Sequence, residues 1–271
     1  MANEVATVNK FEIVTGYENM DAELLEELQD EMEDLDEVKG ISCKKIKIPS
    51  GGGIAFEVET DDPDNPDSEK ELEAVVVFTH RINSYWAESF GGSDSKAPDC
   101  SSFDSKRGVV FETGEIRDCD TCPMNEYGKD GTGKPCKNMR RMYLILSGKP
   151  GVYLLSIPPT SLKEVNNQLA RLMGGSKIPY SRMVLKFKLT KDKNKNGIAY
   201  SKVGIERVGL IPEEYFKTTV AMRKELKEKY KEVVITSDDY TTAPTEPTVD
   251  KDGFVDVEAT GDIIPEELPF N

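Results

Sequence analysis

The sequence predicts a mainly β domain with flanking helices, and two observations carry this prediction. Short apolar runs rich in β-branched and aromatic residues recur along the middle of the chain, at residues 72–82, 139–146, 152–157, 182–189 and 200–208. Two helical patterns accompany them, at residues 162–173 and 212–233. A hydrophobic content of 37% in 271 residues is compatible with one main core and polar segments around it.

The order of these elements narrows the fold. Three strands, one helix and two strands follow one another, which is the order in an OB-fold, a five-stranded barrel that binds oligonucleotides. We therefore expect an OB-fold-like barrel, although other small mixed α/β sheets fit the same order. Ahead of it, residues 46–48 and 54–58 flank a Gly-rich turn and predict a hairpin, and residues 61–70 are typical of a linker.

Acidic segments lie on both sides of this expected domain, which spans residues 41–235. Residues 1–40 are strongly acidic, and apolar residues recur at helical spacing over residues 21–38. This pattern predicts an amphipathic helix, laid either on the domain's own surface or on a partner. Residues 236–271 are rich in Asp, Glu, Thr and Pro, which predicts a disordered acidic tail.

Charge is distributed unevenly along the chain. The net charge is −15, yet residues 73–211 hold 22 Lys and Arg against 14 Asp and Glu. Within residues 131–202 the count is 15 against two, which are Glu164 and Asp192. A basic middle between acidic ends indicates a polyanionic partner.

Four of the five cysteines fall within 37 residues, namely Cys100, Cys119, Cys122 and Cys136. Two cysteines separated by two residues can both reach one ion, and a Gly-rich loop leads on to the last cysteine. We expect a structural zinc loop with four thiolate ligands, inserted at about residues 86–138 between the first two barrel strands. The alternatives are an iron–sulfur cluster, a redox pair at Cys119 and Cys122, and unrelated core thiols.

The remaining reactive residue types favour no enzyme. Cys43 is expected to be a buried or partly buried thiol, and the one histidine, His80, an ordinary strand residue with a local hydrogen bond. The sequence holds no phosphate-binding GxxxxGK[ST] motif, no HExxH and no Ser/His/Asp set. A metal-dependent nuclease is the alternative, and its candidate carboxylates are Asp94, Asp99, Asp104, Glu112 and Glu115.

Cationic and aromatic residues in the basic middle match what single-strand binding requires, which is a positive groove with faces on which bases stack. The candidates are Arg81, Tyr85, Trp86, Phe90, Lys134, Lys137, Arg140, Arg141, Tyr143, Tyr153, Lys177, Tyr180, Arg182, Lys186 and Lys188. Over residues 182–189 cations and apolar residues alternate, which predicts a strand with one basic face.

The end of the chain carries a resemblance to a known family. Its acidic and apolar tip consists of Glu266, Glu267, Leu268, Pro269 and Phe270, followed by Asn271. This tip resembles the tail of bacterial and phage single-stranded DNA-binding proteins, which ends in acidic residues and Pro-Phe. The resemblance implies that the tail recruits replication and repair proteins, although in that family the phenylalanine itself is the last residue.

The middle resembles uncharacterised phage and plasmid proteins. The shared features are Cys-x-x-Cys-Pro at residues 119–123, a Gly-rich loop and Cys-Lys at 128–137, and Pro-Pro-Thr-Ser-Leu-Lys at 158–163. This resemblance implies a bacteriophage setting.

We therefore expect a protein that coats single-stranded DNA without sequence preference in phage DNA replication or recombination, with homo-oligomers left open. The expected location is the cytoplasm of the bacterial host, because no export signal or membrane span is evident. The rival is an adaptor or inhibitor that binds host proteins and uses its acidic ends as a DNA mimic. RNA as the ligand stays open.

Overall fold

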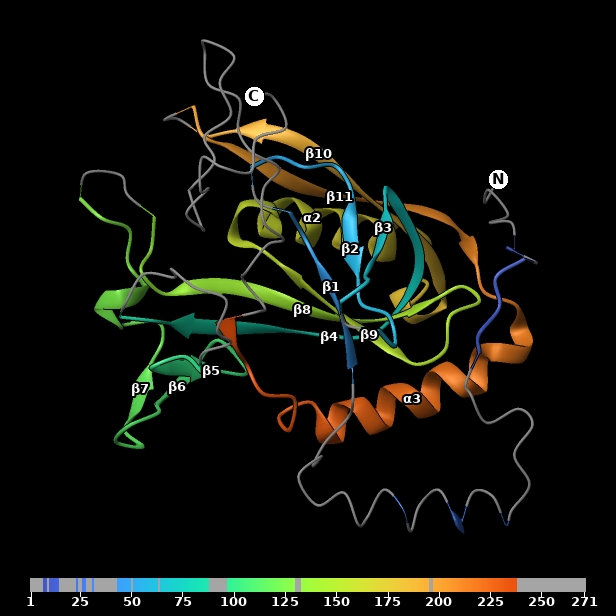
Figure 1. Ribbon diagram of the computed structural model, residues 1–271, viewed down its shortest axis with the longest axis horizontal. Coiled ribbons are helices and arrows are strands. Elements are labelled where there is room, and N and C mark those ends of the chain that lie inside the picture. Colours follow the sequence, from blue (N-terminus) through green and yellow to red (C-terminus); the bar gives the residue numbers. More distant parts are fainter. Residues whose placement is uncertain are drawn as a thin grey trace, which may run out of the picture.

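The computed structural model describes residues 7–8, 10–14, 23, 26–27, 31, 43–49, 51–62, 64–87, 97–129, 133–194 and 197–237. These residues form a mainly β structure with two α-helices, as the sequence predicts (Figure 1). Most of the predicted helix at residues 21–38 lies outside the described residues, although residues 23, 26–27 and 31 are helical and exposed. The predicted tail lies outside them beyond residue 237.

The described strands belong to one mixed sheet of eleven strands. They are β1 (Cys43–Lys47), β2 (Phe56–Val58), β3 (Asp67–Glu69), β4 (Glu71–Tyr85), β5 (Cys100–Ser102), β6 (Arg107–Val110), β7 (Ile116–Asp118), β8 (Lys137–Leu146), β9 (Val152–Ile157), β10 (Met183–Lys193) and β11 (Ala199–Leu210). The main order is β3-β2-β1-β9-β8-β4-β5-β6-β7, and β10 and β11 branch from β4.

Strand β4 is the axis of this sheet. It has 15 residues, and β8 pairs with one of its edges from Ala74 to Ser84. Its other edge is shared, because β10 pairs with the beginning of β4 and β5 with its last three residues. The two ends of β4 therefore have different neighbours.

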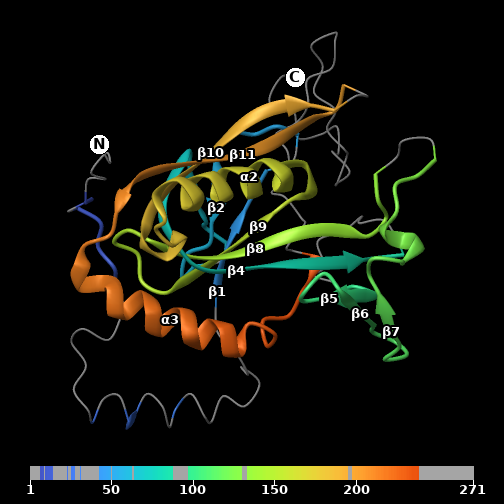
Figure 2. The same ribbon diagram turned by 180° about the vertical axis from the view of Figure 1, so that it is seen from behind.

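Two helices cover opposite faces of the β4–β8–β9 region (Figure 2). Helix α2 (Pro159–Ser176) packs Val165 and Leu169 into one core, and α3 (Phe216–Lys229) packs Leu226 into the other. Because both faces of these strands are buried, their sequences form continuous apolar runs.

The sheet is open, so the prediction of a closed five-stranded barrel is wrong. The five predicted barrel strands are β4, β8, β9, β10 and β11, and four of the expected pairings form: β4–β8, β8–β9, β4–β10 and β10–β11. A barrel would also pair β9 with β11. Instead, the free edge of β9 pairs with β1 in parallel.

Helix α2 lies along the corresponding edge of β11. Ser161 Oγ accepts a hydrogen bond of 2.9 Å from Val203 N, and Gln168 Oε1 accepts one of 3.0 Å from Ile205 N. Two backbone N–H groups of β11 that would pair with β9 in a closed barrel therefore bond to side chains of α2. These bonds also protect β11 as an edge strand.

Two local predictions also need correction. The predicted hairpin forms between β1 and β2, but it belongs to the main sheet, and the predicted linker contains β3, which pairs with β2. Helix α2 continues through Gly174 and Gly175 and ends at Ser176, where Lys177 adopts a left-handed conformation with φ of 58°.

Candidate metal centre and adjacent cationic face

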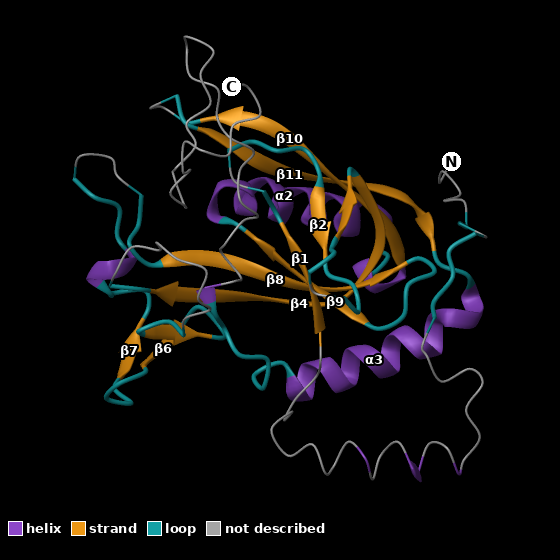
Figure 3. Cartoon of the chain, viewed as in Figure 1, coloured by secondary structure: helices purple, strands orange, loops and turns teal. Residues whose placement is uncertain are grey.

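Between β4 and β8 the chain forms a small unit of short strands and loops, which we call the cysteine module (residues 97–129 and 133–136; Figure 3). Strand β5 attaches it to the sheet, because Cys100 lies opposite Tyr85 of β4. Cys119 directly follows β7, Cys122 precedes the 3-10 turn Pro123–Asn125, and Cys136 precedes β8. The module therefore brings four cysteines from distant positions to one end of β4.

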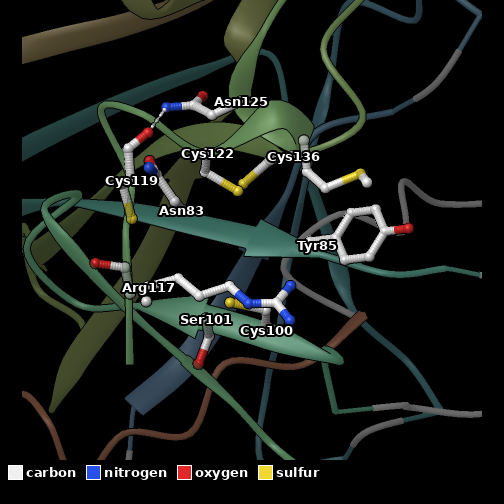
Figure 4. A pocket seen from close by; sticks show the side chains of 12 residues that line it. Asn83, Tyr85, Cys100, Ser101, Arg117, Cys119, Cys122, Asn125 and Cys136 are labelled. Carbon is white, nitrogen blue, oxygen red and sulfur yellow. Dashed lines mark hydrogen bonds between the residues drawn. The ribbon is translucent and has the colours of Figure 1, made fainter. Parts of the chain in front are cut away.

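All four cysteines line one cavity (Figure 4). Asn83 and Tyr85 of β4 contribute to its wall. The cavity has a volume of about 20 Å³, which is room for about one water molecule or one ion. A side chain at Gly108 would narrow it, because a Cβ there would lie 3.0 Å from Cys100 Sγ.

Backbone hydrogen bonds hold the cysteines in this arrangement. Cys119 N donates to Lys106 O at 2.8 Å, and Cys136 N donates to Met124 O at 2.7 Å. The Asn125 side chain donates to Cys119 O at 2.7 Å. All five cysteines are free thiols, so hydrogen bonds rather than disulfides fix the loops.

Burial and mutual repulsion disfavour ionisation of these thiols. Burial, together with repulsion from the neighbouring cysteine thiolates, raises the pKa of Cys136 to about 12. The same two causes raise the pKa of Cys100. For Cys119 burial again raises the pKa, against hydrogen bonds from Ser102 and Asn83. A cation among the four sulfur atoms would remove the repulsion, and four thiolates are a donor set that suits zinc or an iron–sulfur cluster.

The sulfur atoms are not drawn together into a finished coordination sphere. In the part of the chain that the structure describes, no three His, Cys, Asp or Glu side chains form a group that could hold a metal ion. Binding would require the four thiols to approach one another, which is how metal binding couples to local folding.

Burial removes three predicted nucleic-acid contacts from the surface. Arg141 and Tyr143 are 0% exposed and Tyr153 is 3% exposed. The Arg141 guanidinium donates two hydrogen bonds of 2.7 Å, to Val233 O and Val234 O. In this fold the three side chains are not available at the surface, because β8 and β9 bury side chains on both faces.

Other predicted contacts are on the surface but already engaged. The predicted basic face of β10 forms, but Lys186 and Lys188 pair with Glu71 at 3.0 and 3.2 Å. Lys188 also pairs with Glu206 at 3.0 Å. These lysines are neutralised within the fold.

The aromatic candidates and their cationic neighbours mostly pack against the protein. Trp86 packs against a cluster of Ile82, Met139 and Ile235. The Arg182 guanidinium lies 3.8 Å from the centre of the Phe216 ring, and Tyr180 bonds to Arg223. Lys177 is exposed beyond α2, and Phe90 lies outside the described residues.

Five predicted contacts remain beside the cysteine cavity. Arg81 is exposed, Tyr85 and Arg140 are partly buried, and they lie on the far end of β4 and β8. Lys134 and Lys137 lie on the chain that returns from the module, with Lys134 Nζ 5.1 Å from the centre of the exposed Tyr127 ring.

Several neutral residues of this region were not identified as candidates from the sequence. Asn83, Asn138 and Asn166 lie beside the remaining arginines, and Asn138 Nδ2 donates to Asn83 Oδ1 at 2.7 Å. The alternation of Arg81, Asn83 and Tyr85 along one strand was the available signal.

The carboxylates of the nuclease alternative mostly serve local structure. Asp104 accepts hydrogen bonds from Ser102, Lys106 N and Arg107 N, Asp99 accepts one from Ala87 N, and Glu115 pairs with Arg117 at 2.8 Å. Glu112 is exposed, and Asp94 lies outside the described residues.

His80 and Cys43 lie away from the cavity. His80 is in β4, with Nδ1 3.0 Å from Phe103 O, and burial lowers its pKa to about 4. Cys43 is partly buried in β1, and burial raises its pKa to about 12.

Comparison with protein-family models, curated proteins and solved structures finds no match to this chain. Among the described residues, no helix is both long and apolar enough to span a membrane.

Proposed function

We propose that this protein binds single-stranded DNA without sequence preference and acts in phage DNA replication or recombination, in the cytoplasm of the bacterial host. The charge balance of the basic middle carries this proposal. The only two acids of residues 131–202, Glu164 and Asp192, both lie within 3.8 Å of Lys202 Nζ. Most other cations of residues 131–202 therefore either pair with a carboxylate from another part of the chain or have no carboxylate partner in the part that the structure describes.

Four cations near the cysteine cavity lack a carboxylate partner among the described residues. Within the described residues, no ion pair involves Arg81, Lys134, Lys137 or Arg140. Tyr85 lies beside them on the wall of the cysteine cavity. Cations with a nearby aromatic face suit phosphates and bases together.

A structural zinc ion held by Cys100, Cys119, Cys122 and Cys136 belongs to this proposal. Four thiolates would complete the tetrahedral coordination of one zinc ion and leave no open position for an activated water. When bound, zinc would stabilise the loops of the module. The acidic residues 262–271, which resemble the tail of single-stranded DNA-binding proteins, would recruit replication or repair proteins.

Fluorescence anisotropy of labelled oligo-dT across a sodium chloride series tests the proposal. We expect tight binding at low salt that weakens steeply as salt rises, because each phosphate contact releases counterions. An absence of binding at low salt would reject the proposal. Oligo-U measured in parallel decides whether RNA is the better ligand.

A protein-binding adaptor is the second candidate function, favoured by an apolar surface on the cysteine module. Val109 lies opposite Ile116, and these side chains are 47% and 67% exposed. Phe111, two residues along, is 78% exposed. Scattered apolar residues are common on surfaces, so this surface alone is weak support for the adaptor. The adaptor becomes the leading candidate if the protein does not bind oligo-dT.

A further inference from the structure

A polar strip runs along one face of β4 and β8 to the cysteine cavity. On β4 it consists of Arg81, Asn83 and Tyr85, which alternate along the strand and therefore share a face. On β8 it consists of Asn138 and Arg140, which lie opposite Asn83 and Arg81. No member of the strip is a carboxylate, and its far end forms part of the cavity wall.

The arrangement of the two arginines is costly without a ligand. Residues directly opposite on antiparallel strands have Cβ atoms about 5 Å apart, and like charges at such positions are destabilising. Arg81 and Arg140 occupy such a position. Within the described residues, the Arg81 side chain has neither an ion pair nor a hydrogen bond that would offset this repulsion.

Arg140 is held in place by neutral groups. Its Nε donates to Asn166 Oδ1 at 2.7 Å, and its Nη1 donates to Thr79 Oγ1 at 3.2 Å. Burial and the charge of Arg81 lower the pKa of Arg140. The contacts therefore orient the guanidinium without neutralising it, which is what an anion site requires.

We propose that Arg81 and Arg140 jointly bind one backbone phosphate of the single strand, and that Tyr85 stacks against a base further along the same strand. The inference rests on the proposed function and names the phosphate site within it. Two guanidinium groups can present parallel N–H donors to the oxygens of one phosphate. Tyr85 lies about 13 Å further along the same face, at about 3.3 Å per strand residue.

The number of phosphates held by the pair can be measured. For single strands, each neutralised phosphate contributes about 0.7 to the slope of log K against log salt. We expect R81Q and R140Q each to weaken oligo-dT binding about tenfold. The double variant R81Q/R140Q should lower the slope by about 0.7, because the two arginines share one phosphate. A loss of about 1.4 would mean two separate phosphates and would overturn the inference.

Matched variants separate the site from general charge. K186Q and K188Q remove the same charge from β10, where the lysines are paired with glutamates, and should change the affinity less than twofold. R81K/R140K keeps both charges, so it should retain the slope while losing the planar geometry and some affinity. Circular dichroism and thermal unfolding identify any variant that fails to fold. If R140Q fails to fold, R81Q alone is used to test the inference.

A competition experiment tests the phosphate chemistry itself. At equal ionic strength, inorganic phosphate should displace oligo-dT from the wild type more strongly than chloride does, and R81Q/R140Q should lose this difference. A difference that persists in the double variant would overturn the assignment. If wild-type protein binds oligo-dT but R81Q binds it equally well, the inference fails and the proposed function stands. If wild-type protein binds no oligo-dT, both fail.

Discussion

Cationic side chains pair with carboxylates at the beginning of strand β4, whereas at its other end they have no carboxylate partner among the described residues. At its beginning, Glu71 and Glu73 lie opposite Lys188 and Lys186 of β10, and the side chains form ion pairs. At its other end, Arg81 lies opposite Arg140 of β8, and neutral groups orient Arg140. The same strand therefore carries a compensated end and an uncompensated end, and the latter adjoins the four-cysteine cavity.

This difference separates cations that support the fold from cations available to a ligand. A net positive segment does not by itself identify a binding face, because the sheet can supply carboxylates from another part of the chain. Lys186 and Lys188 illustrate this, since Glu71 and Glu73 pair with Lys186, and Glu71 and Glu206 pair with Lys188. The following experiments test the distinction in order of expected effect.

Removing the metal ligands should disrupt the uncompensated end most. We expect C119S/C122S to lose about one zinc per chain by elemental analysis, with faster amide hydrogen exchange across the cysteine module. Structural zinc contributes an apparent free energy of about 10–16 kcal/mol in small zinc peptides. Binding of oligo-dT should weaken as well, because Asn83 and Tyr85 line the same cavity.

C43S is the matched control, because Cys43 lies in β1 outside the cavity. It should retain the metal. Wild-type protein purified without zinc or iron would contradict the metal proposal, and iron in place of zinc would favour a cluster.

Neighbouring arginines of β8 should behave differently. Arg141 is fully buried and donates to two backbone carbonyls after α3. R141Q should lower the free energy of unfolding by about 3 kcal/mol, since it leaves buried acceptors without their charged donor. Chemical denaturation measures this loss. Affinity for oligo-dT, corrected for the folded fraction, should hardly change, and a stable but non-binding R141Q would contradict the division of roles.

Acidification should weaken the packing between β4 and the cysteine module. Burial lowers the pKa of His80 to about 4, below the usual value of about 6.5. A folded-state pKa below the unfolded one means that stability is fully present above pH 6.5 and is lost as the pH falls towards 4. The loss is about 3 kcal/mol. H80N should flatten this part of the pH profile of unfolding, and an unchanged profile would show that other groups cause it.

The compensated end should give the smallest effect. Exposed ion pairs are screened by water and contribute little to stability, so E71Q should shift the midpoint of thermal unfolding only slightly at low salt. The shift should vanish at 1 M salt. A large shift that persists at high salt would mean that Glu71 has a role beyond pairing with Lys186 and Lys188.

The sequence predicted the positions of the main strands better than whether their sheet closes into a barrel. Alternating and continuous apolar runs located β4, β8, β9, β10 and β11, because burial imposes those patterns. The parallel pairing of β1 with β9 depends on a contact between distant segments, and nothing local in residues 43–47 indicates it. The open edge followed from that pairing and from hydrogen bonds to Ser161 and Gln168.

The candidate site was predictable to a similar extent. Cysteine spacing grouped four residues that line one cavity, and the metal they would hold stays a prediction. In contrast, the adjacent Arg140 and Arg141 look equivalent in sequence, and only the packing of α3 and its following segment buries one of them. Which lysines would meet glutamates depended on strand register, which charge counts do not contain.

Photo-crosslinking is the most direct test of the central claim, which is that single-stranded DNA binds at the uncompensated end of β4. Oligo-dT carrying 4-thiothymidine is irradiated with the wild-type protein, and cross-linked peptides are identified by mass spectrometry. We predict cross-links at Tyr85, assigned by fragmentation of the cross-linked peptides, and their loss in R81Q/R140Q. Cross-links confined to β10, around Lys186 and Lys188, would contradict the account.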